Sequence, residues 1–123
     1  MTWSCNDDEC HDTRHINGCN GVISVTSNII PAYFRKMMDE PSPEIKEKTE
    51  KLIDILFRLP NPIGINTLMS MLGLCKPVFR LPYVELDSKT RKEALDIINE
   101  IGLEHFIHKD LQFITSQEFK YIY

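Results

Sequence analysis

Five residues that can bind metals or act as nucleophiles lie close together near the start of the chain, at Cys5, Cys10, His11, His15 and Cys19. In a helix, His11 and His15 would lie one turn apart on the same face, a spacing that can bind zinc. The full pattern, C-x4-C-H-x3-H-x3-C, is not a common zinc-site spacing, and adjacent residues project about 100° apart on a helix. The alternative is a helix that carries these side chains without an ion. We favour the alternative and expect no metal site.

Other catalytic arrangements can be read from the same part of the chain. Cys10 precedes a histidine, but residues adjacent in sequence have poor geometry for a nucleophile and its base. Asp7 and Asp8 could act as a general acid–base pair. Acidic residues at the start of a helix, however, usually cap it and interact favourably with its dipole. Ser24 and Thr26 follow a short apolar run, and the ends of parallel strands are where ligand groups are often placed. Only their position supports that assignment.

The elements that would hold these residues are a helix and a strand. The segment CNDDECHDTRHING predicts a helix from Cys5 to Gly18, with Asn6 or a following aspartate as N-cap and Gly18 as a left-handed stop. The next segment, GVISV (21–25), is short and β-branched, which favours one complete strand buried on both faces as in a parallel sheet. No other segment resembles such a strand. Because unpaired buried backbone groups cost about 1–3 kcal/mol each, we expect its partners to be encoded upstream.

The rest of the chain predicts helices separated by proline-containing breaks, so the chain is expected to be mostly α-helical. The expected helices begin at Ser27 or Asn28, at Ser42–Pro43, at Asn61–Pro62 (ending at Gly73) and at about Asp87 (ending at Ile101, with Gly102 as the stop). The segment CKPVFRLPYVEL (75–86) spaces two prolines across a β-rich run and predicts an extended connector. In the tail DLQFITSQEFKYIY (110–123), apolar and polar residues alternate weakly, which is typical of a small hairpin or a frayed end.

Composition excludes several classes of protein. The 123 residues are 42% hydrophobic and 26% charged, as in an ordinary globular domain. A net charge of −4 argues against binding to nucleic acid or to an anionic membrane, and no apolar run reaches the roughly 20 residues of a membrane span. The first residues, MTWSCNDDECHD, resemble neither a signal peptide nor a transit peptide. Without such a signal, the four cysteines are expected to be reduced thiols.

Four segments occur in an order and spacing that resemble one enzyme family. They are WS-x-NDDECHD-x-R (Trp3 to Arg14), GVISVTSN (Gly21 to Asn28), NPIG-x-NT (Asn61 to Thr67) and PVFRLPYV (Pro77 to Val84). Together they are similar to the carboxyl-terminal part of 4-hydroxy-tetrahydrodipicolinate synthase, also called dihydrodipicolinate synthase, and especially to the plant-type enzyme. The resemblance covers nearly the whole chain.

The resemblance implies an α/β fold, a TIM barrel followed by a helical domain. Residues 1–39 would form part of the barrel: the end of the seventh strand (MTWS), the seventh helix (Asn6 to Asn17), the eighth strand (GVISV) and the eighth helix. Residues 40–123 would form the carboxyl-terminal helical domain and a tail. A closed barrel needs roughly 200–250 residues, so this chain is expected to hold only its end.

The family joins pyruvate to aspartate semialdehyde in lysine biosynthesis by the diaminopimelate route, through a Schiff base on a lysine and a proton relay through a tyrosine. Those motifs precede the seventh strand, so no catalytic residue is expected here, and no cofactor. By resemblance the backbone of Ile23 belongs to the pyruvate site. Cys5 stands where the family has glycine, and His15 and Cys19 also depart from the plant-type pattern. Lys36, the first lysine, lies in a surface-type helix without the desolvation that a Schiff-base lysine needs.

Three hypotheses follow. The chain is a truncated member of the family, inactive alone, that binds a pyruvate-type molecule only when the barrel is completed. Alternatively, its apolar helix faces make it an assembly partner of full-length synthase subunits or of a second copy, since the family forms tetramers. A small metal-binding helical protein built on Cys10, His11, His15 and Cys19 is the third. The plant-type enzyme implies a plastid location, and the absence of a recognisable leader leaves the cytoplasm open.

Overall fold

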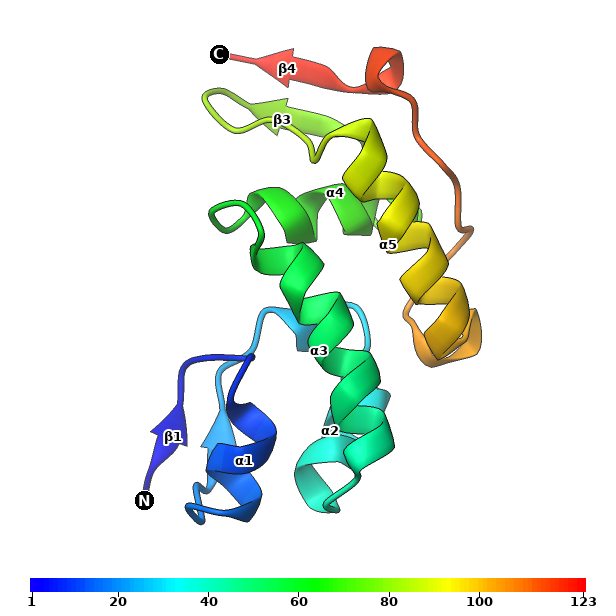
Figure 1. Ribbon diagram of the computed structural model, residues 1–123. Helices are drawn as coiled ribbons and strands as arrows, with labels where there is room; N and C mark the ends of the chain where they lie inside the picture. The colour runs from blue at the N-terminus through cyan, green and yellow to red at the C-terminus, as the bar shows by residue number, and fades with distance from the viewer.

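The computed structural model describes residues 1–123 and contains five α-helices and four short strands. In chain order they are β1 (Trp3–Ser4), α1 (Cys10–His15), β2 (Gly21–Val22), α2 (Pro31–Asp39), α3 (Pro43–Phe57), α4 (Ile63–Met71), β3 (Val78–Arg80), α5 (Ser88–Ile101) and β4 (Lys120–Ile122). The long helix α3 is central in Figure 1: β1, β2, α1 and α2 lie beside its amino-terminal half, and α4, α5, β3 and β4 lie toward its other end. None of the helices is long and apolar enough to span a membrane.

The first sheet consists of β1 and β2, which pair in parallel with Trp3 opposite Gly21 and Ser4 opposite Val22. The indole of Trp3 lies over Gly21 so closely that an added Cβ there would come within 2.4 Å of the ring. The expectation of one complete strand buried on both faces was wrong. The strand β2 has two residues, both only partly buried, and Ile23 beyond it is 68% exposed. Burial on both faces requires covering layers and further strands, and this chain supplies one short neighbour.

The first helix is shorter than predicted, because α1 begins at Cys10 and not near Asn6. The residues before it form a turn in which Asp7 serves a different element, as described below. Gly18 adopts a positive φ of 71°, as its place after the helix predicted. The side chains of Ser27 and Asn28 do not cap α2: residues Thr26–Asn28 form a 3-10 turn, and α2 starts at Pro31 without a side-chain cap.

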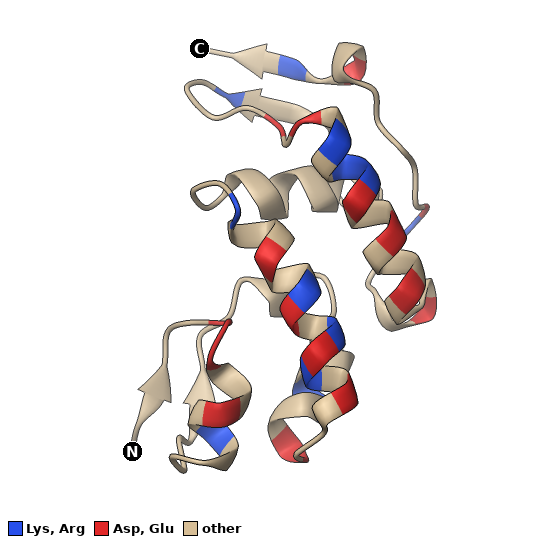
Figure 2. Cartoon of the chain, viewed as in Figure 1, with Lys and Arg blue, Asp and Glu red and all other residues tan.

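The two longest helices have the predicted caps. Ser42 Oγ accepts a hydrogen bond from Ile45 N at the start of α3, and Asp87 Oδ1 accepts one from Thr90 N at the start of α5. Gly102 ends α5 with a positive φ of 106°. The Asn61 cap was wrong: α4 begins at Ile63, and no side chain caps it. Figure 2 shows charged residues along α3 and α5 and none on α4, as expected for a helix whose side chains are mostly buried.

The second sheet was missed. Within the expected connector, β3 forms between the two prolines and pairs in parallel with β4 from the tail, Phe79 facing Tyr121. The tail is therefore neither a hairpin nor a frayed end. Arg91 of α5 is fully buried, donates to Ser116 Oγ at 2.8 Å, and lies over the rings of Phe113 and Phe119. These contacts attach the tail to α5 and bring β4 beside β3.

One hydrophobic cluster joins the elements. Its 23 buried residues extend from Cys10 in α1 to Phe119 in the tail, so it includes side chains on both sides of position 40. Side chains with no exposed surface lie where α3, α4 and α5 meet, at Leu52, Ile55, Leu68, Ala94 and Ile98, and also before α2, at Ile29 and Ile30. The helix α3 contacts elements from both halves of the chain.

Candidate functional site

A hollow of about 660 Å³ lies where β1 and β2 end and α3 passes beside them. We call it the strand-end hollow. It is lined by Cys5, Asn6, Asp7 and Asp8 after β1, by Ile23 and Val25 after β2, and by Glu50, Ile53, Asp54, Phe57, Arg58 and Asn61 in and after α3. The carboxyl ends of parallel strands are the usual place for ligand sites in α/β proteins, so this hollow is the candidate functional site.

Both residues that the family resemblance assigned to the substrate site, Cys5 and Ile23, line this hollow. Cys5 is exposed. The N–H of Ile23 donates to Ser4 O at 2.9 Å, which continues the β1–β2 ladder, while its carbonyl oxygen accepts no hydrogen bond within the chain. The backbone of Ile23 therefore has an acceptor available at the hollow, and the thiol of Cys5 occupies space where glycine would leave it open.

Asp7 is a structural residue of the site whose role was missed from the sequence. It is only 3% exposed, and its Oδ2 accepts hydrogen bonds from Val25 N (3.1 Å), Thr26 N (2.8 Å) and Thr26 Oγ1 (2.7 Å). The carboxylate thus ties the turn after β1 to the turn after β2 and fixes the backbone next to Ile23. Its second oxygen, Oδ1, is buried and has no partner. Sequence reading had treated Asp7 as a cap of its own helix, because nothing local indicates a partner nineteen residues away.

The charges at the hollow are mostly negative. The only cation in its lining, Arg58, binds two carboxylates, Asp54 at 2.7 Å and Glu93 at 2.8 Å, and these hydrogen bonds raise its pKa above the ordinary value. Asp7, Asp8 and Glu50 have no such cation of their own within the lining. No lysine lines the hollow.

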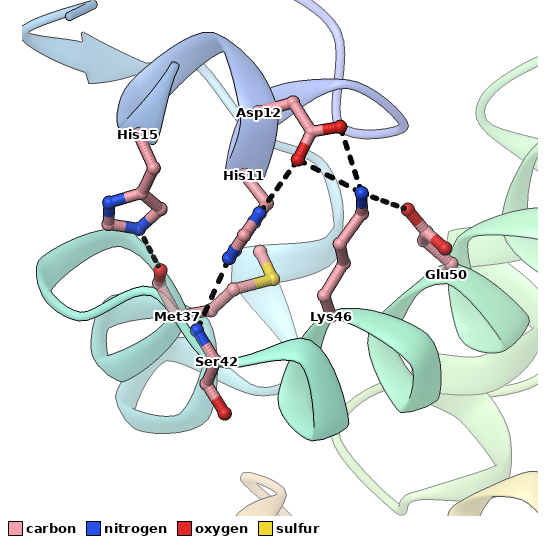
Figure 3. Close-up of polar contacts among 7 residues, drawn as sticks. All are labelled: His11, Asp12, His15, Met37, Ser42, Lys46 and Glu50. Atoms are coloured by element: carbon pink, nitrogen blue, oxygen red, sulfur yellow. Dashed lines mark hydrogen bonds and ion pairs between the residues drawn. The ribbon is translucent and has the colours of Figure 1, made fainter.

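The predicted Cys–His cluster is divided among separate hydrogen bonds (Figure 3). His11 Nδ1 lies 2.9 Å from Asp12 Oδ1, and His11 Nε2 accepts a hydrogen bond from Ser42 N at 3.3 Å. His15 Nε2 donates to the carbonyl oxygen of Met37 at 2.8 Å. Both imidazoles thereby join α1 to the α2–α3 segment.

An ion pair reinforces the same junction. Lys46 Nζ lies 2.8 Å from Asp12 Oδ2 and 3.8 Å from Glu50 Oε1. The hydrogen bond from Lys46 is the main reason that the pKa of Asp12 is lowered, and the same bond raises the pKa of Lys46. Figure 3 shows these side chains filling the space between α1 and α3, which leaves the two histidines in structural roles.

The cysteines of the cluster are likewise unsuited to bind an ion. Cys10 is buried, and desolvation, followed by the negative charge of Asp7, raises the pKa of its thiol to about 12. Metal ligation requires the thiolate. Cys19 is also buried and its Sγ–H donates to Thr2 O at 3.0 Å. No group of three or more metal-binding side chains is arranged to hold an ion, so the structure lends no support to the metal-binding hypothesis.

Comparisons with known proteins agree on one family. The sequence model of the dihydrodipicolinate synthetase family matches residues 1–101. The chain is 47% identical over 121 residues to 4-hydroxy-tetrahydrodipicolinate synthase 1, chloroplastic, of Arabidopsis thaliana, a match that covers 97% of this chain and 33% of the relative. The corresponding soybean (Glycine max) enzyme is 44% identical over 121 residues, covering 97% of this chain and 36% of the relative.

Solved structures give the same result. A protein described as the first monomeric dihydrodipicolinate synthase variant superimposes with a TM-score of 0.77 at 32% identity, over 84% of this chain and 36% of the other. The dihydrodipicolinate synthase of Thermotoga maritima superimposes with a TM-score of 0.73 at 32% identity, over 84% of this chain and 37% of the other. The chain therefore spans about a third of the length of the relatives that it matches.

Proposed function

The chain belongs to the dihydrodipicolinate synthetase family, and on this premise we propose that it is the carboxyl-terminal third of a 4-hydroxy-tetrahydrodipicolinate synthase. Residues 1–39 would be the last strand–helix units of the barrel, and residues 40–123 the helical domain with its tail. The reaction of the completed enzyme would be the condensation of pyruvate with aspartate semialdehyde in lysine biosynthesis. The observation that carries the proposal is the position of the strand-end hollow, at which Ile23 presents a free carbonyl oxygen beside the ends of two parallel strands.

We propose further that the 123-residue chain alone does not catalyse the condensation. A Schiff-base lysine must be neutral to attack a carbonyl, which requires a lowered pKa. No lysine lines the strand-end hollow. In α3 the pKa values of Lys46, Lys48 and Lys51 are raised, first by hydrogen bonds from these lysines to Asp12, Glu44 and Glu100 respectively. The nucleophile would therefore come from the part of the barrel that precedes this chain in the relatives.

Open strand edges support completion by further barrel strands. The N–H of Ile23 donates to Ser4 of β1, so the next backbone N–H, that of Ser24, points away from β1, and it has no backbone partner. Along the same strand, a second hollow of about 400 Å³ is lined by Val22, Phe34 and Met38 among others. In a closed barrel every strand pairs on both sides, so these groups are suited to a neighbouring strand–helix unit. That unit can belong to a longer form of this chain or to a separate polypeptide.

A second candidate function is assembly with full-length synthase subunits. Trp3, Ile16 and Ile23 are large apolar side chains that are 54%, 75% and 68% exposed, all in the amino-terminal region. Exposed apolar groups of this kind are typical of protein interfaces when they are contiguous. Co-purification with an intact synthase would support this function, and separate elution of the two proteins would count against it.

The test is to express the 123-residue chain alone and together with the amino-terminal two-thirds of the Arabidopsis relative, and to measure condensation of pyruvate with aspartate semialdehyde. We expect no turnover from the chain alone and turnover from the complemented pair. Turnover by the chain alone, or none by a stable complex of the two, would overturn the proposal. In the complemented enzyme Cys5→Gly should lower the KM for pyruvate because it removes a side chain from the hollow, and Cys75→Ser, at an exposed cysteine elsewhere, is the matched control.

The names of the plant relatives include a chloroplast location. On that ground we propose that the complete protein works in the plastid. Cell fractionation with an antibody against the tail segment would test this, and recovery of the protein only outside plastids would contradict it.

A further inference from the structure

We propose that Ser116 in the tail is a phosphorylation site, and that its phosphate is bound by the buried guanidinium of Arg91 in α5. The proposal goes beyond the proposed function and does not depend on completion of the barrel. It concerns the contact that attaches the tail to α5, in which Arg91 Nη2 donates a hydrogen bond to Ser116 Oγ at 2.8 Å.

The guanidinium of Arg91 is a buried cation without an anionic partner. Arg91 has no exposed surface and takes part in none of the ion pairs of the chain. Its acceptors are two neutral oxygens, Leu86 O and Ser116 Oγ, and its Nε–H is buried without an acceptor. Buried charges are usually paired with an opposite charge. Arg91 is therefore suited to an anion that the chain itself does not supply.

A second cation lies beside the first. Lys92 is exposed, and its Nζ lies 6.0 Å from the centre of the Phe113 ring, while the Cζ of Arg91 lies 5.5 Å from the same point. The carboxylate of Glu118, in the same turn as Ser116, accepts hydrogen bonds from Thr115 N and Thr115 Oγ1 and forms no ion pair with either cation. The positive charge beside the tail is thus not neutralised by this carboxylate.

Ser116 is placed to receive a phosphoryl group. It is exposed, as are Thr115, Gln117 and Glu118 around it, and its hydroxyl accepts from Arg91 but donates to no group of the chain. In the modification, Ser116 Oγ forms a bond to the γ-phosphorus of a nucleoside triphosphate while the bond from that phosphorus to the β–γ bridging oxygen breaks. The hydroxyl proton passes to a base of the transferring kinase, and the nucleoside diphosphate leaves.

The burial of Arg91 favours a covalent phosphate over a free anion. A free anion does not reach a guanidinium that has no exposed surface. A phosphate on Ser116 is attached at the atom that already accepts from Arg91, and rotation about the Cα–Cβ bond can put a phosphoryl oxygen in the place of Oγ. Hydrogen bonds between phosphate and guanidinium are stronger than those to a neutral hydroxyl. Phosphorylation would therefore hold the tail more tightly to α5 and β4 more tightly to β3.

The first experiment determines whether the modification occurs. The protein is purified with phosphatase inhibitors from the cells that express it, and the tryptic peptide of residues 110–120 is fragmented in a mass spectrometer. We expect a form that is heavier by one phosphoryl group, located on Ser116. A peptide found only without this group, or with it only on Thr115, would overturn the proposal.

The second experiment tests whether Arg91 binds the phosphate. Phosphoserine is incorporated at position 116 during translation, and the matched control carries it at position 117 in place of Gln117, an exposed residue of the same turn whose side chain forms no hydrogen bond. Circular dichroism verifies that both forms are folded, and phosphorus NMR follows the titration of each phosphate.

A guanidinium favours the doubly charged phosphate, so we expect a second pKa of about 6 at position 117 and about tenfold weaker proton binding at position 116. Amide exchange at Leu81 and Lys120, whose N–H groups donate to Ile122 O and Pro77 O between the two strands, should become slower only in the form modified at 116. Equal titration and equal exchange in the two forms would overturn the assignment of Arg91 as the phosphate-binding group.

Discussion

The two ends of the molecule share one hydrophobic cluster, but their secondary structure is fixed in different ways. In the carboxyl-terminal region (40–123), two helices of 15 and 14 residues have side-chain caps, and side chains such as Leu68 and Ile98 have no exposed surface. In the amino-terminal region (1–39), the strands have two residues each and neither α1 nor α2 has a side-chain cap. There, polar groups such as Asp7 and Arg14 hold the turns and loops in place.

This contrast indicates which of the two regions depends more on further strands for its stability. Burial of apolar surface scales with area and does not depend on orientation, so the packed helices can stabilise themselves. A few hydrogen bonds at the surface of a small sheet contribute roughly 0.5–1.5 kcal/mol each, which is a weak basis for independent folding. The region with the candidate site is thus the one whose stability would gain most from added strands.

The largest effect is expected from Leu68→Ala in α4. Leu68 has no exposed surface, so the change removes apolar contacts and leaves a cavity, at a cost of about 2–5 kcal/mol in the free energy of unfolding. Urea unfolding followed by circular dichroism measures it. Leu59→Ala, at a position that is 40% exposed, is the control and should change stability by less than about 1 kcal/mol. Equal losses in the two variants would mean that the helical region is not the stable base.

A smaller but more local effect is expected from Asp7→Asn. The amide oxygen can take the place of Oδ2, but it lacks the negative charge that attracts the three donors from Val25 and Thr26, so we expect a loss of about 1–3 kcal/mol. Amide hydrogen exchange should become faster at Val25 and Thr26 and stay unchanged in α4 and α5. The control is Asp8→Asn, whose carboxylate is exposed. Uniformly faster exchange along the chain would show that the two regions are not distinct.

The cap of α3 tests the boundary between the regions. Ser42→Ala removes the hydroxyl that accepts from Ile45 N and should cost about 1 kcal/mol. The backbone N–H of residue 42 can still donate to His11, so the contact with α1 should persist, and the His11 ring signals in an NMR spectrum should move little. Ser88→Ala, in the first turn of α5 where the cap is Asp87, is the matched control with an expected change below about 0.5 kcal/mol.

The smallest effect on stability is expected at the cap of α5, and it should depend on pH. Hydrogen bonds from the backbone and then the side chain of Thr90 lower the pKa of Asp87. A lowered pKa in the folded state means that the stabilisation is present above the unfolded value of about 3.9 and is lost as the pH falls through the folded value. Asp87→Asn should therefore lower Tm above about pH 4 and converge with the unmodified chain at lower pH, as a thermal unfolding series would show. A constant difference at every pH would contradict this.

Local signals in the sequence were sufficient to predict the long helices. The Ser42 and Asp87 caps and the glycine stops at Gly18, Gly73 and Gly102 depend on residues within one turn, so the pattern identifies them directly. The sheets depend on distant pairing and were predicted poorly. The strand β3 pairs with β4 from the far end of the chain, and neither segment alone has the length or alternation of a strand.

The candidate site was predicted in part, for the same reason. The family resemblance pointed to Ile23 and Cys5, and both line the strand-end hollow. The acidic wall supplied by Glu50 and Asp54 of α3 could not be foreseen, because it depends on how α3 packs beside the residues that follow β1 and β2. The role of Asp7 was missed because its partners are Val25 and Thr26, at the end of the expected strand 21–25 and distant in sequence.

Trp3, the only tryptophan of the chain, lies over Gly21 on the β1–β2 sheet and remains 54% exposed. Fluorescence excited selectively at the indole therefore reports on the amino-terminal region, whereas far-ultraviolet circular dichroism reports mainly on the helices around α3. Denaturation curves recorded by the two optical signals would coincide if the chain unfolds as one cooperative unit and separate if the small sheet is lost first. The position of a single indole thus makes the two regions spectroscopically distinguishable without any label.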